Sequence, residues 1–582
     1  MVERAYGIAA ARPDAVAVAG PAGRLSYRSA AALAVAATAA VSAAGAAEGD
    51  VVAVLAARDI RLPAVLLGVL ASGASWVVLD PDAPSGVLAR QLAAIQVRAV
   101  ISFAGPLAGR PVIDAGELTA ADGAPFVTGT PDTRGYLALT SGTTGEPAPV
   151  RATERPLAHF LAWYPARFGL GPEDRFALLS GLGHDPSLRD MFTPMVTGAR
   201  LCVPAQAWLP DPVRLAGWLR DERVTVLHLT PPLARLLAMA GRALPAVRLI
   251  ALGGDQATFG DVAELRGLAP AARIVSFYGT TETPQAHGCY EVTEEAGDEQ
   301  PVPAGWGIEG SQLLVLDPGG EPAGVGELGE VVIRSKHLAT GYTDPELTSR
   351  RFTGGAFRTG DLGRYRPDGA VVLAGRADDQ VKIRGFRVEL GEVRAVLLGY
   401  RDVKDSFVMI KNRSLHAFAV PAHPSVREAD VMAHLRACLP RYAVPAHLTL
   451  LAALPLTANG KVDREALART SPGRAVPAAQ GPASRTERII AAVWQDVLGL
   501  PRIGVADNFF EIGGHSLAMA GVQSRLERQL GAPVTIVDLF RYPSIRTLAA
   551  HLDGTAPDSA LDRAARRTAM RRERVRRWKE AR

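Results

Sequence analysis

The sequence predicts an α/β protein in three parts: a large α/β domain over residues 1–377, a small α+β subdomain over 378–469 and a compact four-helix domain over 485–553. Three observations predict this division. In the first part, short β-branched runs alternate with helical and turn segments. Before the third part, residues 470–484 are rich in Pro, Gly and Ala and indicate a linker. The third part opens with an amphipathic helix.

The large domain is expected to begin with helices and buried strands. The Ala-rich stretch from Ala30 to Ala47 predicts a helix. Short apolar runs of β-branched residues predict parallel strands that are covered on both faces. These runs are VVAVLA (51–56), SWVVLD (75–80), RLCVP (200–204), VTVLHL (224–229), VRLIAL (247–252) and ARIVSFYG (272–279).

The pattern changes after about residue 310. Short strands with Gly and Pro turns predict an antiparallel subdomain packed on the first part. They are QLLVLDPGG (312–320), GELGEVVIR (326–334) and AVVLAG (370–375). In the helical domain, residues 486–499 place Ile489, Ile490, Val493, Trp494 and Val497 at helical spacing. Residues 554–582 are expected to form a loop and a basic helical tail.

The composition excludes several classes of protein. The 582 residues are 48% hydrophobic and 21% charged, so the chain can bury large cores. Cys202, Cys289 and Cys438 form no CxxC pair, which excludes a zinc ribbon and a disulfide framework and predicts reduced thiols in the cytoplasm. Residues 561–582 hold ten Lys and Arg against three Asp and Glu, so the net charge of +5 indicates a basic tail and no nucleic-acid-binding surface. Charged residues interrupt the apolar run 51–79, and the N-terminus lacks a secretion pattern, so no membrane association is expected.

Five motifs carry the chemistry. In YLALTSGTTGEPAPV (136–150), a strand leads into a loop of Thr, Ser and Gly, whose hydroxyl and peptide N–H groups can donate to phosphate oxygens. Its spacing is not that of a Walker A loop, and an ordinary Gly-rich turn is the alternative. SFYGTTE (276–282) ends in a carboxylate suited to Mg²⁺. FRTGDLGRY (357–365) places Asp361 in a turn, where a carboxylate can accept both hydroxyls of a ribose.

GRADDQVKIRGFRVELGEV (375–393) and LPLTANGKVDREAL (454–467) complete the series. With these five motifs in this order, residues 1–470 resemble the adenylation domains of nonribosomal peptide synthetases, which belong to the acyl-adenylate-forming superfamily. The resemblance implies a large acyl-adenylate-forming N-terminal domain and a small C-terminal subdomain. It also implies that ATP and Mg²⁺ are bound.

The resemblance assigns roles to individual residues. The ATP-binding residues would be Thr140, Ser141, Gly142, Thr143, Thr144 and Gly145 around the phosphates, Gly253, Gly254 and Tyr278 beside the adenine, Thr281, and Asp361 and Arg376 at the ribose. Glu282 would hold Mg²⁺, and Lys461 would be the catalytic lysine. Asp378 would be the hinge about which the small subdomain rotates.

The phosphate loop departs from the family's pattern. Glu146, Ala148 and Pro149 stand where that pattern has Lys, Lys and Gly. The loss of two positive charges and the gain of a negative one should weaken the loop's hold on pyrophosphate. We therefore expect slow adenylation or dependence on a helper protein.

A second resemblance covers the helical domain. DNFFEIGGHSLAMAGV (507–522) resembles the attachment site of a peptidyl carrier protein, with a Gly-Gly turn and Ser516 opening a helix. This implies 4′-phosphopantetheine on Ser516, added by a phosphopantetheinyl transferase. A plain N-cap serine is the alternative. A Ser-His hydrolase is excluded, because His515 is adjacent in sequence and no GxSxG elbow exists.

GLGHDPSLRDMFTP (181–194) lies where the family grips its substrate. The resemblance implies that Asp185 pairs with a substrate ammonium. The other implied pocket residues are His184, Pro186, Arg189, His228, Ile250, Leu252, Phe277, Gln285 and Ala286. The motif HDP…RD resembles the corresponding segment of fungal α-aminoadipate reductases. The side chains of Arg189, His228 and Gln285 suit a substrate with a polar or acidic group. In the alternative, Asp190 neutralises Arg189 and the pocket takes a small residue such as alanine.

The sequence thus predicts an adenylation–carrier didomain that activates an amino acid and loads it onto its own carrier. We expect a loading module of a nonribosomal peptide or hybrid peptide–polyketide pathway, which hands its thioester to a downstream condensation or ketosynthase protein. The basic tail is either a docking helix or a solvated extension. The competing functions are an assembly or binding protein with an impaired adenylation domain and a free-standing acyl-CoA ligase.

Overall fold

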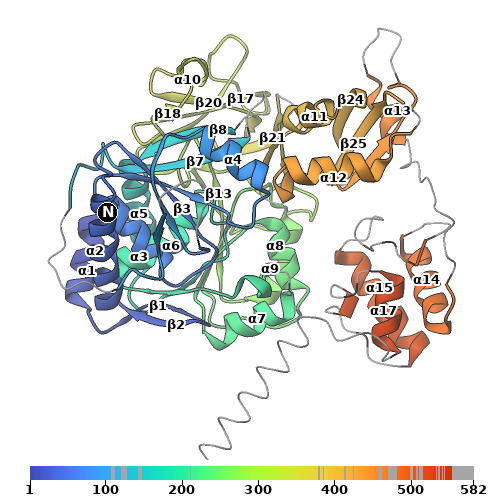
Figure 1. The fold of residues 1–582 in the computed structure, drawn as a ribbon, viewed down its shortest axis with the longest axis horizontal. Coiled ribbons are helices and arrows are strands. Elements are labelled where there is room, and N and C mark those ends of the chain that lie inside the picture. The colour runs from blue at the N-terminus through green and yellow to red at the C-terminus, as the bar shows by residue number, and fades with distance from the viewer. Residues whose placement is uncertain are drawn as a thin grey trace, which may run out of the picture. The chain divides into compact units, whose positions relative to one another are not determined.

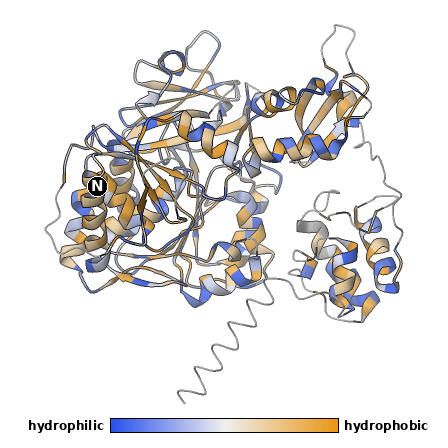
Figure 2. Cartoon of the chain, viewed as in Figure 1, coloured by the Kyte–Doolittle hydropathy of each residue, from blue (hydrophilic) through white to orange (hydrophobic). Residues whose placement is uncertain are grey.

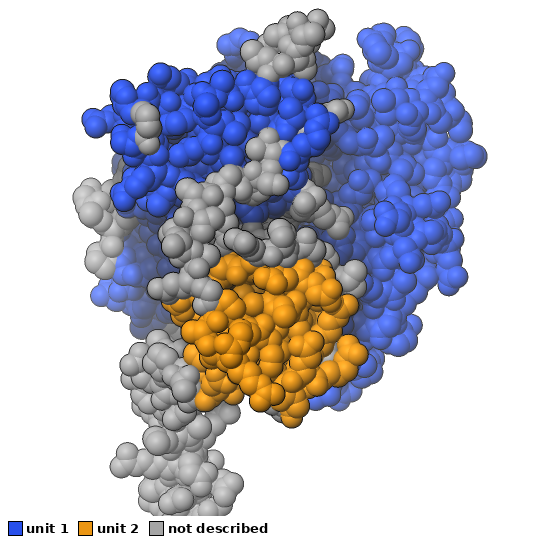
Figure 3. Space-filling view, turned by 90° about the vertical axis from the view of Figure 1, so that its right-hand side faces the viewer, with its two compact units in different colours: residues 1–473 blue, residues 474–582 orange. Residues whose placement is uncertain are grey.

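The computed structural model divides the chain into two compact units, residues 1–473 and 474–582 (Figure 3). It describes residues 1–105, 112–119, 127–141, 147–209, 211–377, 380–383, 386–411, 414–423, 425–455, 462–469, 482–498, 503–505, 507, 509, 516–531, 534, 538–539, 542 and 544–553. Among these residues, no helix is long and apolar enough to cross a membrane.

Two large sheets form the body of unit 1 (Figure 1). The nine-stranded sheet has the order β15 (Trp306–Gly307), β14 (Gly288–Glu291), β13 (Arg273–Tyr278), β12 (Leu249–Leu252), β11 (Val226–Leu229), β9 (Arg175–Ala177), β10 (Arg200–Cys202), β1 (Val16–Gly20) and β2 (Gly23–Ser26). The seven-stranded sheet has the order β18 (Gly341–Tyr342), β8 (Pro147–Thr153), β7 (Gly135–Ser141), β4 (Ser75–Leu79), β3 (Val51–Leu55), β5 (Val97–Ser102) and β6 (Val112–Asp114). The inner strands of both sheets pair in parallel, as the β-branched runs predict.

Helices pack against both sheets. They are α1 (Val2–Ala11), α2 (Tyr27–Ala43), α3 (Leu62–Ala71), α4 (Ser85–Ala93), α5 (Glu154–Phe168), α6 (Pro186–Thr197), η1 (Gln206–Trp208), α7 (Pro212–Asp221), α8 (Pro231–Ala238) and α9 (Phe259–Leu268). Figure 2 shows orange hydrophobic and blue hydrophilic residues side by side on these helices, as expected where one face packs on a sheet. The predicted helix of residues 30–47 begins earlier, at Tyr27, because the side chain of Ser26 accepts a hydrogen bond from the N–H of Ser29.

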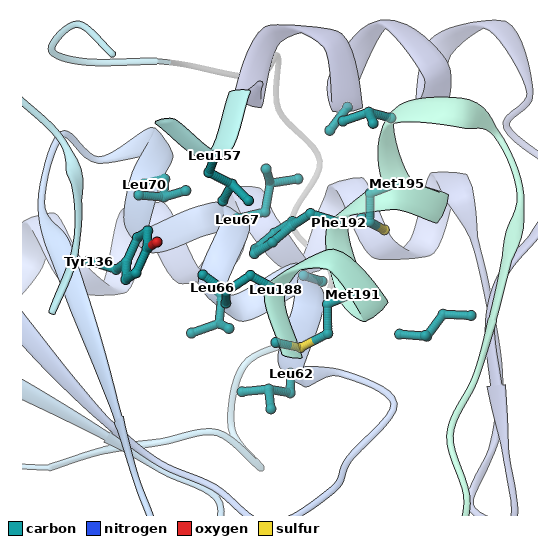
Figure 4. Packing of buried hydrophobic residues seen from close by; sticks show 14 of the residues in the cluster. Leu62, Leu66, Leu67, Leu70, Tyr136, Leu157, Leu188, Met191, Phe192 and Met195 are labelled. Atoms are coloured by element: carbon teal, nitrogen blue, oxygen red, sulfur yellow. The ribbon is translucent and has the colours of Figure 1, made fainter. Parts of the chain in front are cut away.

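The main core lies between α3, α5, α6 and β7. Figure 4 shows Leu188 and Phe192 of α6 pointing toward leucines of α3, among them Leu66 and Leu67. Every residue of α6 from Ser187 to Thr197 is buried. A helix buried all round can carry charged groups only at a cost, so its Arg and Asp residues require an explanation.

An antiparallel sheet follows, as predicted for residues 310–375. It contains β16 (Ser311–Leu316), β17 (Gly329–Ser335), β20 (Ala356–Tyr365), β19 (Phe352–Thr353) and β21 (Val371–Arg376), with α10 (Pro345–Arg351) beside it. Asp361 lies inside β20 and not in a turn, which corrects the expectation for that residue. The strand continues through this position with an irregularity. Gly360 has a φ of 75°, and the register shifts in the pairing of β20 with β17 and in its pairing with β21.

The small subdomain completes unit 1. Its elements are β22 (Gln380–Ile383), β23 (Phe386–Glu389), α11 (Leu390–Leu398), β24 (Val403–Lys411), β25 (Ser414–Pro421), α12 (Glu428–Cys438), η2 (Arg441–Ala443), β26 (His447–Leu450) and α13 (Arg464–Arg469). Unit 2 contains α14 (Arg485–Leu498), α15 (Ser516–Leu530) and α17 (Ile545–Leu552) among its described residues. Trp494 of α14 is fully buried, with its ring 4.7 Å from that of Phe509. Ser516 opens α15, as the sequence predicts.

Candidate active site

The candidate substrate pocket lies where the parallel strands β11, β12 and β13 end. In open α/β sheets, ligands bind beyond the carboxyl ends of the strands. His228 lies one residue before the end of β11, and Phe277 one residue before the end of β13. The start of α6 reaches the same region, because Asp185 contacts Gln285, which follows β13 in the chain.

Asp185 is a buried carboxylate at the start of α6. Its Oδ2 accepts the backbone N–H of Gln285 at 2.9 Å, and its own carbonyl accepts the Gln285 Nε2 at 2.9 Å. Burial raises the pKa of Asp185 to about 6, although the Gln285 N–H and the charge of Arg189 oppose the rise. Gln285 has a φ of 71°, an uncommon conformation that aims its N–H at the carboxylate.

Arg189 lies one helical turn after Asp185. Its residue is 5% exposed, and its guanidinium lies over the rings of Phe160 and Phe277, 5.8 and 5.4 Å from their centroids. Its Nε has no hydrogen-bond partner among the described residues. Burial lowers the pKa of Arg189, while Asp185 and Asp190 raise it through their charges.

A chain of hydrogen bonds beside Arg189 joins α6, β11 and α5. Asp190 accepts the Nδ1 of His228 and the backbone N–H groups of Leu179 and Ser180. The Nε2 of His228 lies 2.8 Å from the hydroxyl of Tyr164. Burial lowers the pKa of His228, which favours a neutral ring that donates to Asp190 and accepts from Tyr164. Both ring nitrogens are therefore used, and His228 shapes the pocket without a free polar atom for a substrate.

The structure does not bring every predicted pocket residue together. Strand residues alternate between the faces of a sheet, and Ile250 and Leu252 face a second core, away from His228 and Phe277. Ala251, between them, faces the other way: it pairs with His228 and belongs to the core that includes Phe277 and Ala286. Pro186 begins α6 beside Asp185. The face of the sheet to which each strand residue points therefore decides which residues can reach the candidate pocket. The sequence alone does not show which of two alternating residues points to that face.

Asp185 also lines a small pocket. It is lined by Trp76, Val78, Tyr136, Leu137, Ala138, Leu182, Gly183, His184, Asp185 and Leu188. Burial lowers the pKa of His184 to about 4, so its ring is neutral. The ring of Tyr442, from the small subdomain, lies 6.3 Å from that of His184.

The predicted ribose site is assembled from three segments. The hydroxyl of Tyr278 donates to Oδ2 of Asp361 at 2.6 Å, and Arg376 donates to Oδ1 of Asp361 and to the carbonyl of Thr359. A carboxylate offers about four acceptor positions, so two remain for the hydroxyls of a ribose. Gly253 and Gly254 directly follow β12. The free acceptor positions of Asp361 and the glycines after β12 fit the ribose and the base of a nucleotide.

Glu282 is fully buried after β13, with Thr281 half-buried beside it. The hydroxyl of Tyr342 donates to Oε1 of Glu282, and the N–H of Ala339 donates to its carbonyl. Mg²⁺ is usually held by one or two carboxylates together with substrate phosphates, so this carboxylate fits the predicted metal. The sequence motifs do not point to Tyr342, because the segment GYTD that contains it carries no metal-binding pattern.

The phosphate loop is described at its two ends. β7 ends at Ser141, and β8 begins at Pro147. The hydroxyl of Thr140 donates to the carbonyl of Ala148 at 2.8 Å, so its proton is used within the β7–β8 pair. Gly142, Thr143, Thr144, Gly145 and Glu146 lie outside the described residues, as do Lys461 and Asp378.

Comparison with known families gives the assignment. A model described as "AMP-binding enzyme" matches residues 7–343, which is more than half of the chain. The chain belongs to the AMP-binding enzyme family. The C-terminal domain of AMP-binding enzymes matches residues 392–461, and a phosphopantetheine attachment site matches residues 488–552. This AMP-binding enzyme therefore joins the two domains of the adenylate-forming ligase family to a carrier domain. That family uses ATP with Mg²⁺, and carrier domains of this kind hold phosphopantetheine covalently.

Individual relatives agree with this assignment. The AMP-binding enzyme is 31% identical to L-2-aminoadipate reductase of Saccharomyces cerevisiae, over 87% of this chain and 45% of that one. It is 33% identical to tyrocidine synthase 3 of Brevibacillus parabrevis, over 88% of this chain and 8% of that one. The solved structure of holo-PA1221, a nonribosomal peptide synthetase protein with adenylation and carrier domains, matches with a TM-score of 0.80 at 25% identity, over 95% of this chain and 96% of that one. The chain thus spans less than half the length of both curated relatives.

Proposed function

We propose that the chain activates an α-amino acid as its aminoacyl-AMP and loads it as a thioester onto the phosphopantetheine of Ser516. One observation supports an amino acid over a simple carboxylic acid. Asp185 places a buried carboxylate at the candidate pocket, and the N–H of Gln285 uses only part of the acceptor capacity of that carboxylate among the described residues. A substrate ammonium would satisfy the remainder. Among the relatives, the reductase is named for an amino acid, 2-aminoadipate.

The chemistry follows from the predicted roles. The substrate carboxylate attacks the α-phosphorus of ATP, a new oxygen–phosphorus bond forms, and pyrophosphate leaves. Lys461 and the positive charge of Mg²⁺ at Glu282 would stabilise the negative charge that develops there. The small subdomain then rotates about Asp378, and the acyl group passes to the thiol carried on Ser516 while AMP leaves. Because α15 begins at Ser516, the positive end of the helix suits a phosphodiester.

We place the chain at the start of an assembly line, as a loading module of a nonribosomal peptide or hybrid peptide–polyketide pathway. A phosphopantetheinyl transferase would prime it in the cytoplasm, and a downstream condensation or ketosynthase protein would take the thioester. A helper protein would compensate for the phosphate loop, where Ala148 and Pro149 are strand residues of β8 and offer no charge.

The test uses the full chain after treatment with a phosphopantetheinyl transferase. We expect ATP–pyrophosphate exchange with at least one amino acid, and a mass increase of about 340 Da on Ser516. Lys461→Ala should abolish exchange and leave the mass increase intact. Ser516→Ala is the matched control, which should keep exchange and lose the mass increase.

The outcomes separate the competing functions. A chain that shows no exchange with any amino acid, even with a helper protein present, would be an assembly or binding protein. A chain that transfers the acyl group to free coenzyme A but never to Ser516 would be an acyl-CoA ligase. Wild-type exchange in Lys461→Ala would remove Lys461 from the mechanism.

A further inference from the structure

The small pocket that Asp185 lines has a wall of two aromatic residues from neighbouring strands. Trp76 on β4 pairs with Tyr136 on β7, and the two rings stack with their centroids 5.1 Å apart. Because alternate strand residues share a face of a sheet, Val78 and Ala138 line the same pocket. Two side chains that carry hydrogen-bond donors thus border the same space as the carboxylate expected to hold the substrate ammonium.

Three buried polar atoms at this place form no hydrogen bond of normal geometry with the described residues. They are Nε1 of Trp76, the hydroxyl of Tyr136 and Oε1 of Gln285, in residues that are at most 4% exposed. The amide of Gln285 has a fixed orientation, because its Nε2 donates to the carbonyl of Asp185, so Oε1 can only accept. Buried polar groups normally have partners, and these three require one that both donates and accepts.

The electrostatics of Tyr136 place these groups near one another. Burial raises the pKa of Tyr136 well above its ordinary value, the charge of Asp185 adds to the rise, and the side chain of Gln285 opposes it. The phenol therefore stays protonated and lies within electrostatic reach of both residues. Tyr136 and Gln285 are close without a well-formed hydrogen bond between them, which is the situation in which a water commonly bridges two polar groups.

The pocket has the size of one water molecule. About 10 Å³ is open to the centre of a water-sized sphere, which is close to the least that one water needs. A water accepts two hydrogen bonds and donates two. With Trp76 and Tyr136 as donors, and Asp185 and Gln285 as acceptors, all four of its bonds find a partner.

We propose that one water molecule resides in this pocket, and that Trp76 and Tyr136 position it against the carboxylate of Asp185. The role of the water rests on the proposed function, because it assumes that Asp185 holds the substrate ammonium. A carboxylate is stabilised in its ionised form when it accepts hydrogen bonds, and a water that is itself held by two donors is a better donor. Trp76 and Tyr136 are thus positioning residues that keep Asp185 charged.

The first test is structural. A crystal structure of the full chain, at a resolution that shows ordered waters, should place one water about 2.7–3.2 Å from Nε1 of Trp76, from the hydroxyl of Tyr136 and from a carboxylate oxygen of Asp185. A structure in which these three side chains are ordered and no water lies between them would overturn the proposal.

The second test measures how Asp185 titrates. Tyr136→Phe and Trp76→Phe each keep an aromatic ring and remove one donor. Each should raise the midpoint of the pH profile of kcat/KM in ATP–pyrophosphate exchange by about 0.5–1 pH unit, because the ionised carboxylate loses support. The loss of activity should therefore be largest at acidic pH and shrink as the pH rises. A midpoint that does not move, or a loss that is equal at every pH, would overturn the proposal.

Tyr6→Phe is the matched control. Tyr6 on α1 is also buried, and its hydroxyl also has no hydrogen-bond partner among the described residues, but it does not line the pocket. Its removal should leave the midpoint unchanged, and a shift equal to that of Tyr136→Phe would overturn the proposal. If Trp76→Phe does not fold, Tyr136→Phe alone decides.

Infrared difference spectroscopy separates this proposal from the proposed function. The spectrum of the wild type minus that of Asp185→Asn reports the ionisation of this carboxyl and requires neither substrate nor catalysis. The same difference is measured with Tyr136→Phe present in both proteins. A midpoint raised by Tyr136→Phe, in a chain without exchange activity, would support the water site and refute the proposed activity. Exchange activity with an infrared midpoint that does not move would refute the water site and leave the activity.

Discussion

The protonation of Asp185 should control amino acid binding. Burial raises its pKa to about 6, and only the ionised form attracts an ammonium. Because kcat/KM reports groups of the free enzyme, kcat/KM for the amino acid should be level above pH 6 and fall about tenfold per pH unit below it. The pH profile of ATP–pyrophosphate exchange measures this directly.

Asp185→Asn provides the control for that profile. Its activity should be low at every pH, and its profile should lack the step near pH 6, because no carboxyl remains to titrate. The ratio of wild-type to variant kcat/KM removes the titration of ATP itself. A wild-type ratio that stays level from pH 5 to 7 would show that Asp185 does not hold the ammonium.

At the scale of elements, the contact between α2 and α3 depends on one small residue. A Cβ added to Gly68 in the middle of α3 would lie 2.3 Å from the carbonyl oxygen of Ala34 on α2. Gly68→Ala should therefore destabilise the N-terminal domain by about 1–3 kcal/mol, although alanine is the better helix former. Thermal unfolding should show a lower Tm.

Gly7 offers a matched control in another helix. It lies within α1, is exposed and has no atom within 4 Å of an added Cβ. Gly7→Ala should stabilise the chain by up to about 1 kcal/mol through helix propensity alone. If both substitutions raise the Tm, the close approach of α2 and α3 does not limit the packing.

The sequence predicts the buried strands of this protein better than it predicts which strands pair with one another. The buried strands β3, β4 and β10 to β13 follow from apolar β-branched runs. β8 was missed, because Pro147 and Pro149 normally exclude a strand. β18 pairs with Val150 and Arg151 of β8, and on this side Pro149 only accepts the N–H of Thr343 through its carbonyl, so the missing N–H groups of the two prolines interrupt no strand pairing there.

In the candidate site, too, contacts between segments far apart in the sequence could not be predicted. Asp185 and Arg189 are expected here from the resemblance of residues 181–194, and the structure shows both buried at the start of α6. The use of both His228 nitrogens could not be predicted, because Tyr164 and Asp190 come from distant segments that only the fold brings together. The resemblance implies that Ile250 and Leu252 line the pocket, whereas both side chains face the second core, because a single step along a strand moves a residue to the other face.

At the scale of the whole molecule, the basic tail remains a prediction from the sequence, because residues 554–582 lie outside the described part of the chain. If it docks onto an acidic patch of the downstream protein, deletion of residues 556–582 should leave exchange and self-loading unchanged and impair transfer to that partner. High salt should reproduce the defect, because exposed charges are screened beyond about 8–10 Å. Transfer that is unaffected by both treatments would identify a solvated extension.

The chain of bonds under the pocket has a consequence for the divergence of such enzymes. Asp190, His228 and Tyr164 satisfy one another and two backbone N–H groups without any ligand. If Arg189 meets the substrate, as the resemblance implies, a substitution there changes that contact and leaves these hydrogen bonds of the described residues in place. A duplicated gene could exchange this one side chain and acquire a new amino acid while the surrounding architecture, and with it the foldability of the protein, is inherited intact.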